Sequence, residues 1–215
     1  MPILRESPYI WVTWLNKLLV GENSCEWTAW FRANHTEYAK VPSTFDQVSW
    51  QLQHTALVNQ LRERFEKEGK AVLSESQNRF TLRGRAAALG GKPDLIVRSG
   101  NTGVICDAKT GNPSASHSAQ VMVYMWALPF IKQQHHGVSF NGLVAYRDHE
   151  VMIPSSAIDE TFINNLVQLI KRVSSKEPAR KVSSLTECRF CDINHADCLE
   201  RVAEYTSQES ITNDF

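Results

Sequence analysis

The sequence predicts an α/β (α+β) domain with a central mixed sheet flanked by helices. Three observations support this fold class: a long segment with helical spacing of apolar residues, a series of short apolar runs bounded by turn residues, and two later helical segments separated by strands. At 215 residues, of which 42% are hydrophobic, the chain is long enough to bury one sizeable core. We therefore expect one domain of ordinary size.

The first part of the chain is expected to be helical. Residues 9–20, with the sequence YIWVTWLNKLLV, are apolar and aromatic and have a helical look. From 43 to 69 the helical pattern is clear, because apolar and ring residues recur every three or four positions: Trp50, His54, Leu57, Leu61 and Phe65. This spacing places His54 on the buried face of a long helix.

Strands and two further helices follow. Four short extended segments are predicted around 71–76, 79–85, 94–98 and 103–109. A helix over 114–127, ended by Pro129, carries Gln120 and Tyr124 four residues apart on one face. The remaining predicted elements are two strands and an amphipathic helix: 138–146, 150–153 and 156–174.

Composition limits the possible partners and the compartment. Lys plus Arg and Asp plus Glu both number 23, so overall charge gives no argument for a nucleic-acid partner. No apolar run approaches the roughly 20 residues that span a bilayer, and the amino terminus lacks a signal-peptide pattern. We expect a cytoplasmic protein without membrane contact. In the reducing cytoplasm, the five cysteines are expected to be free thiols or metal ligands rather than disulfides.

The segment 91–111, GKPDLIVRSGNTGVICDAKTG, carries charges that a plain hairpin would not need. Asp94 opens the first apolar run, and Asp107 and Lys109 close the second. Because side chains alternate along a strand, Asp107 and Lys109 share a face while Cys106 and Ala108 share the other. Folding at the turn can bring Asp107 and Lys109 close to Asp94. Two converging carboxylates and a backbone carbonyl can bind a divalent cation that supports phosphodiester hydrolysis.

The charged hairpin alone leaves two interpretations open, a metal site or a surface hairpin whose charges keep it soluble. The other candidate residues are also ambiguous when taken singly. A histidine on an apolar helix face is often a core residue, and Gln120 with Tyr124 could be an ordinary helix edge and a core aromatic. Together, however, the residues occur in the order that a metal-dependent nuclease needs: His54, Asp94, Asp107-Ala108-Lys109, Gln120 and Tyr124.

At these residues the sequence resembles the RecB-type branch of the PD-(D/E)xK nuclease superfamily. The motifs that carry the resemblance are His54, GKPDLI, ICDAKTG, AQVMVY and the cysteines. It implies a restriction-endonuclease-like core in which Mn²⁺ or Mg²⁺ is bound by His54, Asp94, Asp107 and the backbone carbonyl of Ala108. It also implies a catalytic Lys109, with Gln120 and Tyr124 in supporting roles. An imidazole ligand favours manganese as the more active metal.

A second cluster of candidate ligands lies near the carboxyl terminus. Cys188, Cys191 and Cys198 follow a C-x2-C-x6-C pattern and need a fourth ligand to complete a tetrahedral set. With Cys25 the site would be a 4Fe-4S cluster, which resembles those of the CRISPR-associated iron-sulfur exonuclease and AddB-type nucleases. With His195 it would be a compact Zn²⁺ site. We favour the iron-sulfur cluster, and we expect Cys106 to point into the core.

The resemblance implies a metal-dependent DNA nuclease, most similar to single-stranded DNA exonucleases of CRISPR adaptation, recombination and DNA repair, or of phage and antiviral defence. CRISPR adaptation or recombination proteins are possible partners, and oligomeric state is left open. The alternative is a non-cleaving DNA-binding or assembly subunit with a structural zinc or iron-sulfur site. The expected organisation is a helical segment at 1–42 that supplies Cys25, a nuclease core at 43–175, a linker and cysteine region at 176–205, and a polar tail at 206–215.

Overall fold

The central element of the fold is a five-stranded mixed sheet, seen in a computed structural model that describes residues 1–43, 45–131 and 135–202. The polar tail expected at 206–215 lies outside the described residues. The strand order is β10-β9-β8-β7-β4. The bounds of these strands are β4 Ala71–Ser74, β7 Leu95–Ser99, β8 Thr102–Ala108, β9 Ser139–Ala145 and β10 Glu150–Ile153. Only β8 and β9 run parallel in this sheet, so the predicted mixed sheet is confirmed.

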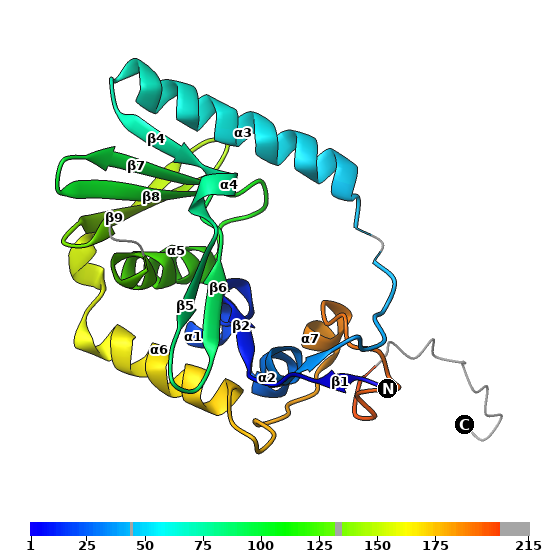
Figure 1. Cartoon of the computed structure of the whole chain (residues 1–215). Helices are drawn as coiled ribbons and strands as arrows, with labels where there is room; N and C mark the ends of the chain where they lie inside the picture. Colours follow the sequence, from blue (N-terminus) through cyan, green and yellow to red (C-terminus); the bar gives the residue numbers. More distant parts are fainter. Residues whose placement is uncertain (44, 132–134, 203–215) are drawn as a thin grey trace, which may run out of the picture.

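Helices cover both faces of this sheet, as Figure 1 shows. One face packs on α3 (Gln47–Lys67), whose buried apolar residues meet Leu95, Cys106 and Ala108. The other face packs on α5 (Ala115–Ala127), with Ile96 and Ile105 in the larger part of the core and α6 (Glu160–Val173) further out. The alternation predicted along the second hairpin strand is therefore confirmed, because Cys106 and Ala108 lie on the α3 side.

The connection between the two parallel strands is the reason for the position of α5. Parallel neighbours need a crossover, and α5 supplies it between β8 and β9. The helix begins at the N-cap residue Ser114, whose side chain accepts a hydrogen bond from the Ser116 amide. It ends where Leu128–Phe130 tighten into a 3-10 turn around Pro129, close to the predicted boundary.

The prediction of one helix over 9–20 is wrong in its first half. Tyr9–Trp11 form strand β2, which pairs in parallel with β6 (Ala88–Gly91), and β6 in turn pairs with β5 (Phe80–Arg83). The β-branched and aromatic residues of β2 suit a strand once a partner is present. A short 3-10 turn, Val12–Trp14, and helix α1, Asn16–Leu19, complete this segment. Strand β6 was missed, because its two glycines were interpreted only as turn signals.

The remaining elements are short. They are β1 (Ile3–Leu4), α2 (Glu26–Asn34), β3 (His35–Thr36), α4 (Glu75–Asn78), the 3-10 turn Ser155–Ala157 and α7 (Leu185–Arg189). The long helix expected at 43–69 is confirmed as α3, and the strands expected at 138–146 and 150–153 are confirmed as β9 and β10. Trp50 is an exception to the predicted buried face of α3, since it is 36% exposed. No helix among the described residues is both long and apolar enough to cross a membrane.

The two ends of the described chain pack on each other. Trp27, Trp30 and Phe31 of α2 form a separate apolar cluster with Ile193 and Cys198. The loop residue Lys40 pairs with Ile193 in an isolated antiparallel bridge. Arg32 and Asp192 add an ion pair with an N–O distance of 2.5 Å. The segment around α2 and the segment after α7 therefore form one structural unit beside the sheet (Figure 1).

The close approach of α5 to β9 generates a prediction about stability. A Cβ atom at Gly142 would lie 2.6 Å from Val121 Cγ1 and 2.9 Å from Met125 Sδ, so these side chains or the elements that carry them would have to shift. Gly142→Ala should lower the free energy of unfolding by about 1–3 kcal/mol. Gly111→Ala is the matched control, because its Cβ would meet no atom within 4 Å. Chemical denaturation of both variants measures the difference, and equal stabilities would contradict the packing.

Candidate active site

The two acids of the charged hairpin lie face to face at one end of the sheet. In the β7–β8 pairing Leu95 lies opposite Cys106, so Asp94, one residue earlier, lies beside Asp107, one residue later. The backbone N–H of Ala108 donates a 2.7 Å hydrogen bond to Asp94 Oδ2. His54 Nε2, from α3, lies 3.2 Å from the same oxygen. Both carboxylates are buried, with 7% of Asp94 and 3% of Asp107 exposed.

Lys109 and Gln120 surround the second carboxylate. Lys109 Nζ lies 2.6 Å from Asp107 Oδ2 and donates to Gln120 Oε1 at 3.0 Å. The Gln120 amide group donates to Asp107 Oδ1 and to the Tyr124 hydroxyl, each at 3.0 Å. The spacing of four residues on α5 thus places Gln120 and Tyr124 in one network with Asp107, as expected from their shared helix face.

Two buried asparagines that the sequence analysis did not select support this corner. Asn16 Nδ2, from α1, lies 3.4 Å from Gln120 Oε1. Asn78 Nδ2, from α4, donates to the carbonyl oxygens of Leu73, Pro93 and Asp94, and Asn78 is only 2% exposed. It therefore fixes the backbone where β7 begins. A lone asparagine in an apolar stretch was the only signal for Asn16 in the sequence.

Burial dominates the electrostatics of the corner. Removal from water raises the pKa of Asp107 to about 6, against the lowering effect of Lys109 and with a further raising effect from Asp94. Burial also raises the pKa of Tyr124 far above its ordinary value, so its hydroxyl stays protonated. Two buried acids thus face one ammonium group, and an additional cation would offset the excess negative charge.

The donor set suits a hard divalent cation, although the side chains are not arranged around one. Among the described residues, no three His, Cys, Asp or Glu side chains are placed to hold a single metal ion. The reason lies in the contacts above, since Lys109, Gln120 and the Ala108 amide already lie against carboxylate oxygens. Asp107 Oδ2 is buried, and the Lys109 ammonium at 2.6 Å is its ion-pair partner.

The family model that matches residues 22–196 is that of the PD-(D/E)XK nuclease superfamily. The chain belongs to this superfamily. The fold agrees with a restriction-endonuclease-like core, a mixed sheet flanked by helices. One solved structure, a crystal structure of SSO0001, is 19% identical to the nuclease with a TM-score of 0.49, and the match covers 93% of this chain and 90% of that chain. The comparison with curated proteins found no match.

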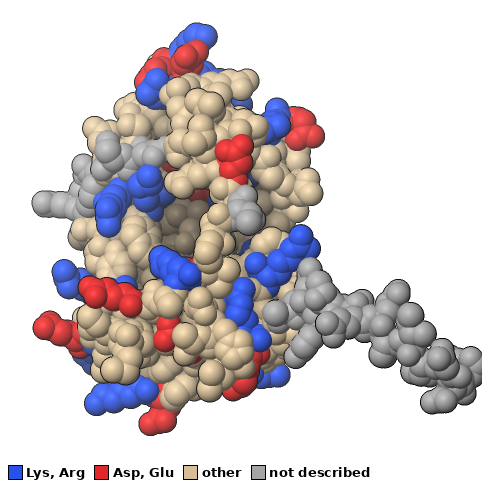
Figure 2. All heavy atoms as spheres, turned by 90° about the vertical axis from the view of Figure 1, so that its right-hand side faces the viewer, with Lys and Arg blue, Asp and Glu red and all other residues tan. Residues whose placement is uncertain are grey.

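The corner that holds Asp94 and Asp107 opens into a cavity of about 490 Å³. The two carboxylates, Lys109 and Gln120 line this cavity, and so do Trp50 and Gln51 of α3 and Trp11 of β2. The side of the molecule toward which this end of the sheet points is hollowed near its centre, and both basic and acidic side chains lie around the hollow (Figure 2).

The cysteines near the two chain ends come together at a second cavity, of about 200 Å³. It is lined by all four predicted cluster residues: Cys25, Cys188, Cys191 and Cys198. The Thr28 hydroxyl lies 3.6 Å from Cys25 Sγ and 3.8 Å from Cys191 Sγ. His195 is exposed and does not line the cavity. These thiols share a cavity, but no three of them are close enough to form a preorganised metal site.

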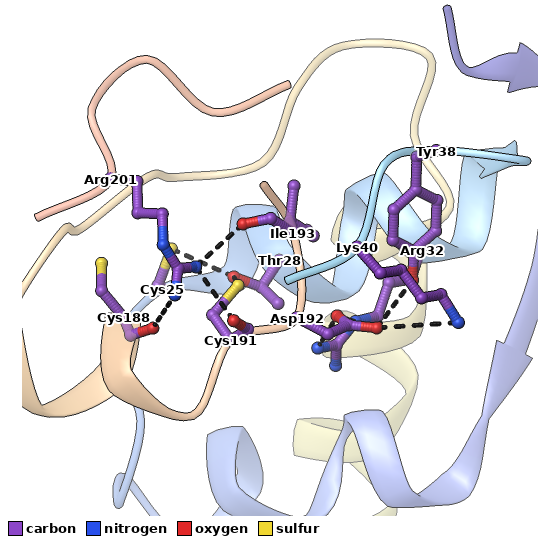
Figure 3. Close-up of polar contacts among 10 residues, drawn as sticks. All are labelled: Cys25, Thr28, Arg32, Tyr38, Lys40, Cys188, Cys191, Asp192, Ile193 and Arg201. Carbon is purple, nitrogen blue, oxygen red and sulfur yellow. Dashed lines mark hydrogen bonds and ion pairs between the residues drawn. The ribbon is translucent and has the colours of Figure 1, made fainter. Parts of the chain in front are cut away.

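Arg201 and Glu187 organise the backbone around these thiols. As Figure 3 shows, Arg201 reaches across the loop and donates to the carbonyl oxygens of Cys188, Cys191 and Ile193. The Glu187 carboxylate accepts hydrogen bonds from the backbone N–H groups of Ser24 and Cys25 at 2.9 and 3.1 Å. Cys106 lies elsewhere in the core, where burial raises its pKa to about 12.

The raised pKa of Asp107 predicts how stability depends on pH without metal. A carboxyl group whose pKa is higher in the folded than in the unfolded state stabilises the fold while protonated, and this contribution is lost as pH rises through about 6. The Asp107→Asn variant should not show this loss of stability as the pH rises. Its free energy of unfolding relative to the parent should therefore rise between pH 4 and pH 7.5, by at most roughly 3 kcal/mol. Denaturation in chelator at several pH values measures this, and a constant difference would contradict the assignment.

Proposed function

We propose that this nuclease is a divalent-metal-dependent deoxyribonuclease that acts as an exonuclease on single-stranded DNA. The observation that carries the proposal is the buried pair Asp94 and Asp107 with the Lys109 ammonium at 2.6 Å from the second acid. A phosphodiester hydrolase needs carboxylates to hold a cation and a cationic group near the attacking water. The superfamily assignment supports the same chemistry.

The residues of the corner divide this work between them. Asp94, Asp107, His54 and the Ala108 carbonyl would hold Mn²⁺ or Mg²⁺, which when bound polarises a phosphoryl oxygen and acidifies water. Lys109 orients the attacking water and offsets charge that develops on the phosphoryl oxygens. The Gln120 side-chain N–H donates a hydrogen bond to Asp107 Oδ1, and Gln120 Oε1 accepts one from Lys109 Nζ. Gln120 therefore keeps both side chains in place. Tyr124 acts through Gln120.

The first test is cleavage of end-labelled DNA. The protein should degrade single-stranded DNA in Mn²⁺ or Mg²⁺, with manganese the more active, and should be silent in chelator. Shortening from an end, with a circular strand left intact, would identify an exonuclease. Lys109→Ala and Asp94→Ala should each reduce the rate at least about 100-fold, because each removes a group that acts on the transition state. Leu52→Ala, on an exposed position of α3, is the control.

The opposite results would overturn the nuclease proposal. Robust cleavage in chelator would exclude the metal mechanism, and full activity of Lys109→Ala would mean that the active site is elsewhere. Binding of DNA without cleavage in either metal would favour a non-cleaving DNA-binding or assembly subunit. The resemblance of the motifs to nucleases of CRISPR adaptation, recombination and phage or antiviral defence supports a role in one of these pathways, with proteins of that pathway as partners.

We further propose that Cys25, Cys188, Cys191 and Cys198 hold a 4Fe-4S cluster with a structural role. Their shared cavity supports this set over a zinc site completed by His195, which is exposed and lies outside the cavity. Arg201 and Lys181 supply positive charge near a cluster that four thiolates would make negative. Such a cluster would fasten α2 to the segment that follows α7, and its binding would contribute to folding.

The cysteine assignment is tested by metal analysis of single variants purified without oxygen. Cys25→Ser should lose its iron and its broad visible absorbance, because an opened cluster is exposed to solvent and oxidation. Cys106→Ser and His195→Ala should keep their iron, since one thiol lies in the core and the imidazole lies on the surface. Zinc in place of iron, or metal that depends on His195 and not on Cys25, would establish the alternative site.

A further inference from the structure

A row of aromatic rings leads from the protein surface into the catalytic corner. The Trp50 ring stacks on His54, with centroids 5.0 Å apart and planes 23° apart. Phe45, just before α3, lies 6.2 Å from Trp50 with ring planes 57° apart, so the two rings are tilted and do not stack. His54 in turn contacts Asp94. One face of Trp50 is thus tied to a predicted metal ligand, while 36% of the residue remains exposed at the cavity.

The position of these rings is not explained by the core. Phe45 is 61% exposed, and neither it nor Trp50 belongs to an apolar cluster of buried residues. Leu52, on the same helix, is also exposed but does not line the cavity. A large aromatic side chain kept partly in water beside an active site indicates a binding surface rather than packing.

A second aromatic group lines the same cavity from a different element. Trp11, in β2, is half-buried and packs edge to face on Tyr9 with centroids 5.8 Å apart. The Arg79 guanidinium lies 5.4 Å from the Trp11 ring centroid, which adds a positive charge beside this ring. The cavity therefore has one tryptophan from α3 and another from the β2 sheet, together with the two carboxylates.

We propose that Trp50 and Trp11 are stacking platforms for unpaired nucleobases next to the scissile phosphate, so that they select a single strand. This inference rests on the proposed nuclease function and names the residues that determine its substrate class. Every base has a flat apolar face, so such platforms bind single strands with little sequence preference. In a duplex the same faces are covered by neighbouring base pairs, and a base would first have to leave the stack.

The size and charge of the cavity agree with this role. A volume of about 490 Å³ lies in the range of roughly 300–1,000 Å³ that holds small ligands, a class to which a nucleotide belongs. Lys92 and Lys109 line the cavity and can meet phosphate oxygens, while the platforms meet the bases. Backbone and base would thus be recognised by different side chains, as expected for a strand-selective and sequence-tolerant site.

The test is binding in the Lys109→Ala background, which prevents cleavage during the measurement. The probes are a fluorescein-labelled oligothymidylate and a fully abasic strand of the same length, which keeps the phosphates and lacks the bases. Trp50→Ala should weaken binding of the oligothymidylate roughly 5- to 100-fold. It should change binding of the abasic strand less than about twofold, because no base remains to stack. Trp50→Tyr should restore most of the loss.

Controls and a second variant keep the test decisive. Leu52→Ala should bind both probes like the parent. Trp11→Leu should show the same pattern as Trp50→Ala. Thermal melting shows whether this strand variant still folds. If it does not fold, the result with Trp50→Ala alone decides the test. The platforms are refuted if Trp50→Ala weakens both probes equally, if it leaves oligothymidylate binding unchanged, or if Leu52→Ala has the same effect.

The two levels of the proposal can fail separately. If Trp50→Ala weakens binding only of the strand that carries bases, but the protein cleaves no DNA in Mn²⁺ or Mg²⁺, the stacking role stands and the nuclease function is refuted. If the protein cleaves DNA in a metal-dependent way, but Trp50→Ala shows no base-dependent loss of binding, the nuclease function stands and the stacking role is refuted. If Trp50→Ala weakens the binding of duplex DNA as much as the binding of single strands, strand selection would also be refuted, because the platforms should have little effect on paired bases.

Discussion

The antiparallel register of β7 and β8 is the constraint on which the site depends. Because Leu95 lies opposite Cys106, Asp94 and Asp107 meet at the end of the hairpin, and the Ala108 amide donates to Asp94. A shift of one residue would turn Asp107 toward the leucines of α3 and Cys106 toward α5. The apolar residues on both faces of these strands oppose that shift. The packing of the core therefore fixes the position of the acids.

Placing two acids in a core is unfavourable, and the surrounding polar residues reduce the cost. Lys109 and Gln120 lie against Asp107, Gln120 in turn contacts Asn16 and Tyr124, and Asn78 holds the backbone at Asp94. Each of these residues thereby makes at least one polar contact within a network that spans α1, α4, α5 and the hairpin. Even so, burial still raises the pKa of Asp107, which indicates that the network does not compensate the charge fully.

The sequence was most informative where local patterns decide the structure. The helical spacing over 43–69, the alternation along 103–109 and the proline after α5 each predicted an element that is present. The strand Tyr9–Trp11 was misjudged because its parallel partner, Ala88–Gly91, is distant in sequence, and its glycines resemble a turn. Asn16 and Asn78 were missed for the same reason, since their roles depend on contacts with Gln120 and Asp94 that only the folded chain creates.

The cavity with the two acids and the cysteine cavity are adjacent, because the segment 11–18 contributes to both. Thr13 lines both cavities, Trp11 lines only the catalytic one, and Lys17 lines the cysteine cavity and lies over the exposed Phe190 ring. Asn16, between them, reaches Gln120 in the active site. Packing that holds α2 against the carboxyl-terminal segment therefore also confines α1 and, through Asn16, the side chain that positions Asp107. The joined chain ends thus support the corner that holds the two acids.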